Sequence, residues 1–189
     1  MTFDVQALLV STGVVALGEM GDKTQLLAFI LAAKFKKPLP IIAGIFVATI
    51  LNHATAGALG AWLTSLVSAH TMQMILGVSF IAMGLWTLIP DKLDEDDAKL
   101  AQFGVFTTTV IAFFLAEMGD KTQIATVALA AKFPTDLFSV VAGTTAGMMI
   151  ADVPAVLFAQ TVIQKVPLKI VHGIAAAIFI VMGIATLLY

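Results

Sequence analysis

Long apolar stretches dominate the chain, and short polar or proline-bearing segments separate them. The apolar stretches cover residues 5–33, 41–63, 72–89, 103–131, 137–163 and 170–188. Each approaches or exceeds the roughly 20 residues that a helix needs to cross a bilayer. The strands of a membrane barrel would be about 10 residues long and apolar only at alternate positions, whereas these stretches are apolar on both faces. The pattern predicts an all-α integral membrane protein with six transmembrane helices.

The composition supports this interpretation and excludes a soluble enzyme. Of the 189 residues, 60% are hydrophobic and 12% are charged, and the mean hydropathy is +1.02. A soluble domain has about 45–50% apolar and about 25% charged residues. The net charge of −2 offers no basic surface for nucleic acid, and the absence of cysteine excludes disulfides and thiolate metal ligands. The first lysine is Lys23, so the positive n-region of a cleaved signal peptide is missing and we expect the first stretch to be retained.

The lysines predict the orientation of the chain, because cytoplasmic loops of membrane proteins carry an excess of positive charge. Seven lysines lie in the first, third and fifth connecting segments: Lys34, Lys36, Lys37, Lys92, Lys99, Lys165 and Lys169. The connecting segments of the opposite side carry a single lysine, Lys132. Both termini are therefore expected on the non-cytoplasmic side. The third segment also holds the acidic residues 91–97, which are either a solvated linker or a cytoplasmic ion-collecting patch.

An internal repeat divides the chain into two halves. Residues 18–25 (GEMGDKTQ) recur as residues 116–123 (AEMGDKTQ), with seven of eight positions identical at an offset of 98. The pattern predicts a first three-helix repeat at residues 1–90, a linker at 91–102 and a second repeat at 103–189. Because three is an odd number, the second copy enters the membrane from the opposite side, as in the inverted repeats of many secondary transporters.

Charged residues interrupt the first and fourth stretches near their middles. They are Glu19, Asp22, Lys23, Glu117, Asp120 and Lys121. An ionised residue at the centre of a transmembrane helix costs about 2.5–3.5 kcal/mol, so these residues must be paired, protonated, hydrated or coordinated. A purely structural ion-pair network is one interpretation, but such a network is often no more stable than apolar packing. The duplication of the motif favours a functional site.

The spacing within the motif predicts a site for a hard divalent cation. Glu and Asp are three residues apart and share one helical face, and a glutamine three residues further extends that face by a turn. The residues on these faces are Glu19, Asp22, Gln25, Glu117, Asp120 and Gln123. If the two motif helices cross at their midpoints, four carboxylates and two amides converge, which suits Ca²⁺ or Mn²⁺. Lys23 and Lys121 offset part of this negative charge, and a lysine can also stabilise the empty site of an antiporter.

The second and fifth stretches add polar residues at the middle of the membrane. Asn52 and His53 lie in the second stretch, and Asp152 lies at the aligned position of the fifth. Asp152 is a candidate proton carrier or extra ligand. Asn52 either joins the site or only forms a hydrogen bond between helices. His53 is expected to form a hydrogen bond rather than to bind metal.

Glycines in the apolar stretches are expected to mark packing faces. These faces are Gly44 with Ala48, Gly57 with Gly60, and Gly143 with Gly147. Beside the motif carboxylates, Gly18, Gly21 and Gly119 either allow close helix approach or break the helix and free backbone carbonyls. Of these two roles, we expect close approach.

The twice-repeated Glu-Met-Gly-Asp-Lys-Thr sequence resembles the signature of the calcium/manganese cation transporter family, Glu-φ-Gly-Asp-(Lys/Arg)-(Thr/Ser). That family includes bacterial manganese exporters and a eukaryotic Golgi transporter, and it is related to the cation/Ca²⁺ exchangers. The resemblance covers essentially the whole chain. It implies a cation site with Lys23 and Lys121 as motif members and the following expected ligands: Glu19, Asp22, Thr24, Glu117, Asp120 and Thr122. It also implies exchange of Mn²⁺ or Ca²⁺ for protons, by an exporter of the bacterial inner membrane.

The sequence thus predicts a secondary active transporter, not an enzyme, that exports a divalent cation in exchange for protons. Mn²⁺ or Ca²⁺ is the expected substrate and H⁺ the counter-ion, and no bound cofactor is expected. The expected mechanism is rocking of the two inverted halves around a site at the membrane midplane. The alternatives are an exporter of a cationic metabolite, such as a basic amino acid, and a membrane scaffold that contains ion pairs. The lipid bilayer is the expected partner, and both a monomer and a homodimer are compatible with a chain that holds both halves.

Overall fold

The computed structural model describes residues 3–89, 104–158 and 168–188, which form helices and no strands. The helices are α1 (Val5–Glu19), α2 (Lys23–Phe35), α3 (Pro38–Leu63), α4 (Ala69–Thr87), α5 (Val105–Glu117), α6 (Lys121–Lys132), α7 (Leu137–Leu157) and α8 (Leu168–Leu188). The predicted all-α fold is confirmed for this part of the chain. The predicted linker at 91–102 with its acidic residues 91–97, and Lys92, Lys99 and Lys165, lie outside the described residues.

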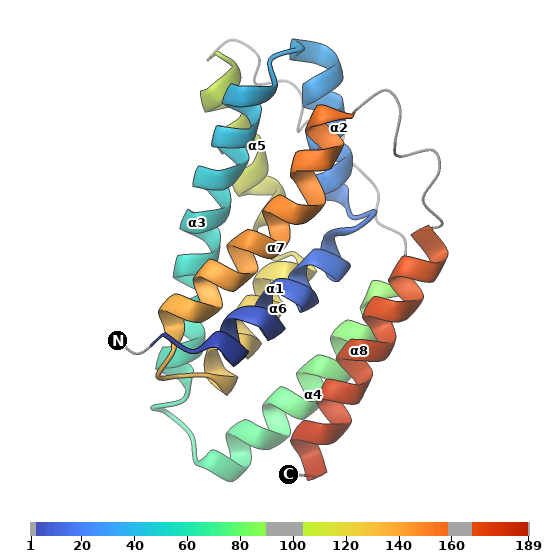
Figure 1. Cartoon of the computed structure of the whole chain (residues 1–189). Helices are drawn as coiled ribbons and strands as arrows, with labels where there is room; N and C mark the ends of the chain where they lie inside the picture. Colours follow the sequence, from blue (N-terminus) through green and yellow to red (C-terminus); the bar gives the residue numbers. More distant parts are fainter. Residues whose placement is uncertain (1–2, 90–103, 159–167, 189) are drawn as a thin grey trace.

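The first and fourth apolar stretches are each interrupted in the middle rather than continuous (Figure 1). Gly21 separates α1 from α2, and Gly119 separates α5 from α6. These two glycines have φ values of 83° and 75°, a left-handed conformation that glycine adopts readily and that costs other residues roughly 1–2 kcal/mol. The expectation that they only allow close helix approach is therefore wrong. Both glycines break their helices.

The lengths and composition of the helices show which of the predicted spans could cross a membrane. Among the described residues, α3, α4 and α7 are long and apolar enough to cross a membrane, whereas α1, α5 and the Gly173–Leu188 part of α8 are shorter apolar helices. Large apolar side chains such as Leu9, Leu39 and Val181 are exposed on the outer surface of the bundle. Extensive exposed apolar surface is rare in soluble proteins and is suited to contact with lipid.

The helices of the two predicted repeats interleave. α1 packs along α7, and α3 packs against α5, α6 and α7. α4 and α8 pack along each other and form a pair beside the other six helices (Figure 1). Each repeat therefore buries its apolar faces mainly against the other repeat, so the two halves are not separate bodies.

The glycines predicted to mark packing faces do lie where helices meet. A Cβ atom added to Gly143 in α7 would lie 2.5 Å from the backbone oxygen of Leu8 in α1. At Gly60 in α3, it would lie 2.2 Å from the backbone oxygen of Val127 in α6. Backbone atoms also lie close at Gly44 and Gly147, whereas at Gly57 the nearest atom is the side-chain Cδ1 of Leu137, at 2.7 Å. Because backbone atoms cannot move aside as a flexible side chain can, the backbone contacts require glycine.

Gly60→Ala is expected to destabilise the protein by about 1–3 kcal/mol or more, because the added methyl group forces α3 away from α6. Thermal unfolding in detergent, followed by circular dichroism, measures the effect as a lower midpoint temperature. Gly13→Ala in α1 is the matched control, since no atom lies within 4 Å of a Cβ added there. Equal midpoints for the two variants would contradict the close packing of α3 on α6.

Candidate cation site

The two helix breaks bring acidic residues from both repeats together in the interior. Glu19 ends α1, whereas Glu117 and Asp120 lie on either side of the break between α5 and α6. One carboxylate oxygen of each lies within 4.8 Å of the other two, and all three residues are buried. A cation with bonds of roughly 2.0–2.6 Å holds ligands on its opposite sides about 4–5 Å apart. The three carboxylates are therefore close enough to share one ion.

Lysines of each repeat pair with an aspartate of the other repeat. Lys23 Nζ lies 3.7 Å from Asp120 Oδ1, and Lys121 Nζ lies 3.7 Å from Asp22 Oδ1. The two pairs differ in exposure, because the side chain of Lys23 is 26% exposed and that of Lys121 is 6% exposed. Lys121 Nζ also lies 5.9 Å from the ring centre of Trp86 in α4. The pairing follows the sequence repeat, but the surroundings of the two pairs do not.

Asp22 is not one of the three carboxylates that lie within 4.8 Å of one another, but it is within electrostatic range of Glu19. It is the N-cap of α2, where its Oδ1 accepts a 2.8 Å hydrogen bond from the backbone N–H of Lys23. Asp120 is the equivalent N-cap of α6 and does belong to the cluster. Of the four carboxylates predicted to converge, the structure thus groups three and pairs the fourth with Lys121.

The two motif threonines contact the two motif glutamates. The hydroxyl of Thr24 donates a hydrogen bond to Glu19 Oε2, and that of Thr122 donates to Glu117 Oε1. The remaining oxygens, Glu19 Oε1 and Glu117 Oε2, are buried and have no hydrogen-bond partner among the described residues. A buried carboxylate oxygen without a partner is costly. Either a cation or a proton bound at these oxygens would relieve that cost.

The motif glutamines hold the helix breaks in place. Gln25 Oε1 accepts a 2.8 Å hydrogen bond from the N–H of Gly21, and Gln123 Oε1 accepts a 2.7 Å bond from the N–H of Gly119. Their amide nitrogens reach the long helices of the opposite repeats. Gln25 Nε2 donates to the backbone oxygen of Ala151 at 2.9 Å, and Gln123 Nε2 donates to Oδ1 of Asn52 at 3.3 Å. Each glutamine therefore ties its own glycine break to α7 or α3.

The middle of α3 and the middle of α7 complete the site. Asn52 Nδ2 donates a 3.1 Å hydrogen bond to the backbone oxygen of Phe114, so this residue links α3 to both α5 and α6. His53 Nε2 lies 3.5 Å from Glu117 Oε1, which places the ring at the cluster. Asp152 is buried, lies within electrostatic range of Glu117, and has no hydrogen-bond partner at either oxygen among the described residues. The sequence predicts only a hydrogen-bonding role for His53, although its offset of 99 from Asp152 was a usable signal for the site.

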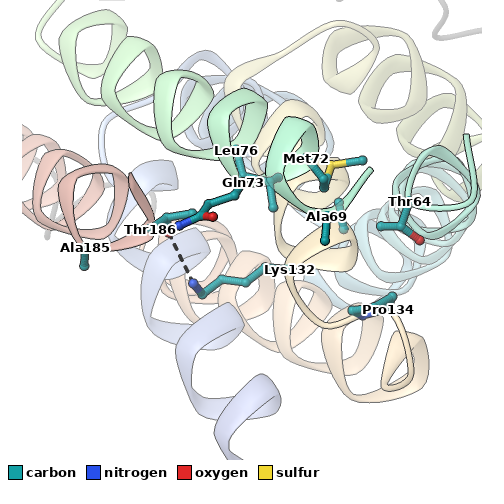
Figure 2. A pocket seen from close by; sticks show the side chains of 10 residues that line it. Thr64, Ala69, Met72, Gln73, Leu76, Lys132, Pro134, Ala185 and Thr186 are labelled. Carbon is teal, nitrogen blue, oxygen red and sulfur yellow. Dashed lines mark hydrogen bonds between the residues drawn. The ribbon is translucent and has the colours of Figure 1, made fainter. Parts of the chain in front are cut away.

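A cavity of about 620 Å³ lies away from these residues, between α4, α6 and α8. Its lining includes Thr64, Gln73, Lys132 and Thr186. Figure 2 shows Lys132 directed toward Thr186, and the Nζ and Oγ1 atoms are 3.2 Å apart. None of the predicted cation ligands lines this cavity, so it is not the cation site.

Comparisons with known proteins agree with the chemistry of the site. A family model described as "Divalent cation/proton antiporter GDT1" matches residues 7–95 and 105–189, in two parts that agree with a duplicated chain. A Vibrio cholerae serotype O1 protein named "Putative manganese exporter" is 46% identical over 182 residues, or 96% of this chain and 90% of that protein. Arabidopsis thaliana GDT1-like protein 5 is 28% identical over 222 residues, or 97% of this chain and 96% of that protein. No solved structure matches the chain.

Proposed function

The chain belongs to the GDT1 family of divalent cation/proton antiporters, and from this premise we propose that it exports Mn²⁺ from the cytoplasm in exchange for protons. It is a multi-pass membrane transporter and not an enzyme. The observation that carries the proposal is the cluster of three buried carboxylates at the two helix breaks. Mn²⁺ is proposed rather than Ca²⁺ because the V. cholerae relative bears the name of a manganese exporter.

The proposed direct ligands are Glu19, Glu117 and Asp120, whose oxygens are close enough to bind one cation. Asp22 takes part through its ion pair with Lys121. The remaining motif residues support the ligands by orienting the glutamates and holding the breaks: Thr24, Thr122, Gln25 and Gln123. Asn52 fixes the position of the second break through Gln123.

Proton coupling follows from competition for the same oxygens. A carboxylate that binds a metal must be deprotonated, so protons arriving from outside displace Mn²⁺ from the cluster. Asp152 is buried beside Glu117 and Glu19 and is proposed as a further proton acceptor. Lys23 and Lys121 provide positive charge in the cluster when the carrier returns without metal, which lowers the cost of its buried carboxylates.

The proposed topology has six membrane crossings in two inverted repeats, with both termini on the non-cytoplasmic side of a bacterial inner membrane. Lys34, Lys36 and Lys37 at the end of α2 mark the cytoplasmic side, and Lys132 at the end of α6 lies on the opposite side. In this arrangement α1 with α2, and α5 with α6, each form one interrupted crossing. The site draws its ligands from both repeats of one chain, so a monomer is sufficient, and a homodimer stays a prediction.

The packing of α4 and α8 indicates which side of the site is closed. α4 packs against α6 and α8 packs against α1, and both α1 and α6 lie between the breaks and the side that carries the termini (Figure 1). Over the described residues, α2 and α5 on the opposite side pack far less against this pair. We therefore propose that the structure is closed on the side that carries the termini. Because the two halves interleave, the α4–α8 pair is proposed to move in place of the predicted rocking halves.

A polar contact on the closed side joins two residues that have repeat equivalents on the other side. Lys132 contacts Thr186 at 3.2 Å, and the repeat offsets place Lys34 and Thr87 at the equivalent positions near the cytoplasmic side. There, the hydroxyl of Thr87 donates instead to the backbone oxygen of Met83 at 2.8 Å. A contact between Lys34 and Thr87 is proposed to form when the carrier faces outward.

Paired cysteines introduced into this cysteine-free chain test that assignment. In metal-free protein, a short bis-maleimide is expected to cross-link a Lys132→Cys/Thr186→Cys variant readily. A Lys34→Cys/Thr87→Cys variant is expected to react at about one tenth of that rate or below, because an alternative state of this kind is populated at about 0.1–10%. Mobility on denaturing gels measures both rates, with the single-cysteine variants as controls. Faster reaction of the second pair would contradict closure on the side of the termini.

Reconstitution into liposomes tests the proposed function. With a Mn²⁺-sensitive dye and a pH-sensitive dye inside the vesicles, Mn²⁺ entry is expected together with proton exit. Metal entry without proton movement would indicate a uniporter or channel instead. Flux of lysine or arginine without metal flux would favour the exporter of a cationic metabolite, although both site lysines already pair with aspartates. No flux of either kind would favour a scaffold.

A further inference from the structure

His53 lies at the cluster but belongs to neither repeated motif. Its side chain is fully buried, and its Nε2 is 3.5 Å from Glu117 Oε1. This separation is longer than the roughly 2.7–3.2 Å of an ordinary N–H···O hydrogen bond. The second ring nitrogen, Nδ1, has no hydrogen-bond partner among the described residues. A buried imidazole without a good hydrogen bond is costly, so packing alone does not account for the residue.

The two-fold relation between the repeats shows which residue His53 replaces. Gln25 Nε2 donates to the backbone of Ala151, and Gln123 Nε2 donates to the side chain of Asn52. Ala151 and Asn52 are thus equivalent, and the residues that follow them, Asp152 and His53, are equivalent in turn. The site therefore carries a carboxylate on one side and an imidazole at the corresponding place on the other.

The position of the imidazole suits a ligand that shares a cation with Glu117. Two neighbouring ligand atoms on a six-coordinate ion with bonds of about 2.1 Å lie about 3 Å apart, close to the 3.5 Å observed between His53 Nε2 and Glu117 Oε1. Ca²⁺ takes six to eight oxygen ligands. Imidazole suits Fe, Ni, Cu and Zn best, and Mn²⁺, at the weak end of the same first-row series, accepts it more readily than Ca²⁺ does. Exchanging one carboxylate for an imidazole removes oxygens that Ca²⁺ needs and adds a nitrogen that Mn²⁺ accepts.

We propose that His53 Nε2 is a ligand of the transported cation and that this nitrogen makes the site prefer Mn²⁺ to Ca²⁺. The inference rests on the proposed function, because it assigns specificity to the same site. It differs from the expectation that His53 serves only as a hydrogen-bonding residue. It also assigns the two equivalent positions different tasks, since the carboxylate of Asp152 is proposed to accept a proton, whereas the imidazole of His53 binds the cation.

Pulsed electron paramagnetic resonance of the Mn²⁺-loaded protein, with any purification tag removed, tests the ligand directly. Wild type and His70→Gln, which changes an exposed histidine of α4, are expected to show the modulation of a ¹⁴N nucleus bound to Mn²⁺. His53→Gln is expected to lose it. Absence of the modulation in wild type, or its persistence in His53→Gln, would overturn the proposal. If wild type bound no Mn²⁺ at all, the proposed function would fail together with it.

Transport competition gives a second readout of the same proposal. His53→Asp places a carboxylate where the repeat predicts one, and it is expected to strengthen inhibition of Mn²⁺ uptake by Ca²⁺ roughly tenfold or more. An unchanged ratio of Ca²⁺ to Mn²⁺ affinity would contradict the assigned specificity. Should His53→Asp fail to fold, His53→Gln takes its place, with an expected roughly tenfold loss of Mn²⁺ affinity and no loss of Ca²⁺ affinity.

Discussion

Glu117→Gln is expected to lower the rate of Mn²⁺ exchange in proteoliposomes about 100-fold or more. Glutamine keeps the size of the side chain and still accepts the hydrogen bond from Thr122, so the fold is preserved. It removes one of the three negative charges that share the cation. Loss of one partner of a buried charge interaction costs about 3–5 kcal/mol, and each 1.4 kcal/mol is about a factor of ten. Glu19→Gln and Asp120→Asn are expected to behave in the same way.

Asp136→Asn is the matched control for these variants. It makes the same chemical change at the N-cap of α7, outside the three-carboxylate cluster. Its exchange rate is expected to stay within about twofold of wild type, because Asp136 is only partly buried and does not contribute to the cluster. Wild-type exchange by Glu117→Gln, measured with the dye inside the vesicles, would contradict the ligand assignment. A comparable loss in Asp136→Asn would show that the effect is not specific to the cluster.

Lys121→Met is expected to lower the thermal midpoint of the protein by at least about 6 °C. The change leaves Asp22 as a buried charge without its lysine, and breaking a buried pair costs about 3–5 kcal/mol. For a protein of this size, each kcal/mol shifts the midpoint by about 2–4 °C. Circular dichroism of the detergent-solubilised protein measures the shift. The double variant Asp22→Asn/Lys121→Met removes both charges and is expected to regain most of the lost stability.

Lys23→Met is the internal control that the repeat supplies. Its pair with Asp120 has the same 3.7 Å separation, but the Lys23 side chain is 26% exposed, compared with 6% for Lys121. Water screens the exposed pair, so the expected loss of stability is less than half that of Lys121→Met. Equal losses for the two lysines would contradict the unequal surroundings of the two pairs. A double variant Asp22→Asn/Lys121→Met no more stable than Lys121→Met would contradict the explanation by a buried charge.

Much of the fold could be predicted from the sequence, because the length of the apolar stretches and the repeated motif can be read from the chain itself. The all-α class follows from stretches that are apolar on both faces, and the family resemblance drawn from the repeated motif is confirmed by the family match. The breaks at Gly21 and Gly119 could not be predicted in this way. Glycine permits both a continuous helix and a left-handed φ. The hydrogen bonds that favour the break, donated by Gly21 and Gly119 to the side chains of Gln25 and Gln123, form only after folding.

For the site too, the sequence predicts which residues are involved better than how they are arranged after folding. The motif spacing predicted that carboxylates of both repeats meet, and the structure groups Glu19, Glu117 and Asp120. It did not predict that Asp22 pairs with Lys121 outside this group, because that depends on the direction of α2 after the break. His53 was missed as a site residue because a single histidine in an apolar stretch is more often a hydrogen-bonding residue than a metal ligand, although its offset from Asp152 placed it at the same depth. The interleaving of the repeats was also beyond the sequence, since repeat boundaries do not say which helices pack together.

Anomalous diffraction at the manganese absorption edge, from crystals grown with Mn²⁺, locates the transported cation without any assay of flux. One strong peak is expected at the two helix breaks, with oxygens of Glu19, Glu117 and Asp120 at roughly 2.0–2.6 Å from the ion. The wavelength dependence of the peak identifies the metal without reference to transport. Peaks confined to other places, such as the acidic residues 91–97, with none at the breaks, would contradict the claim that this cluster holds the transported cation.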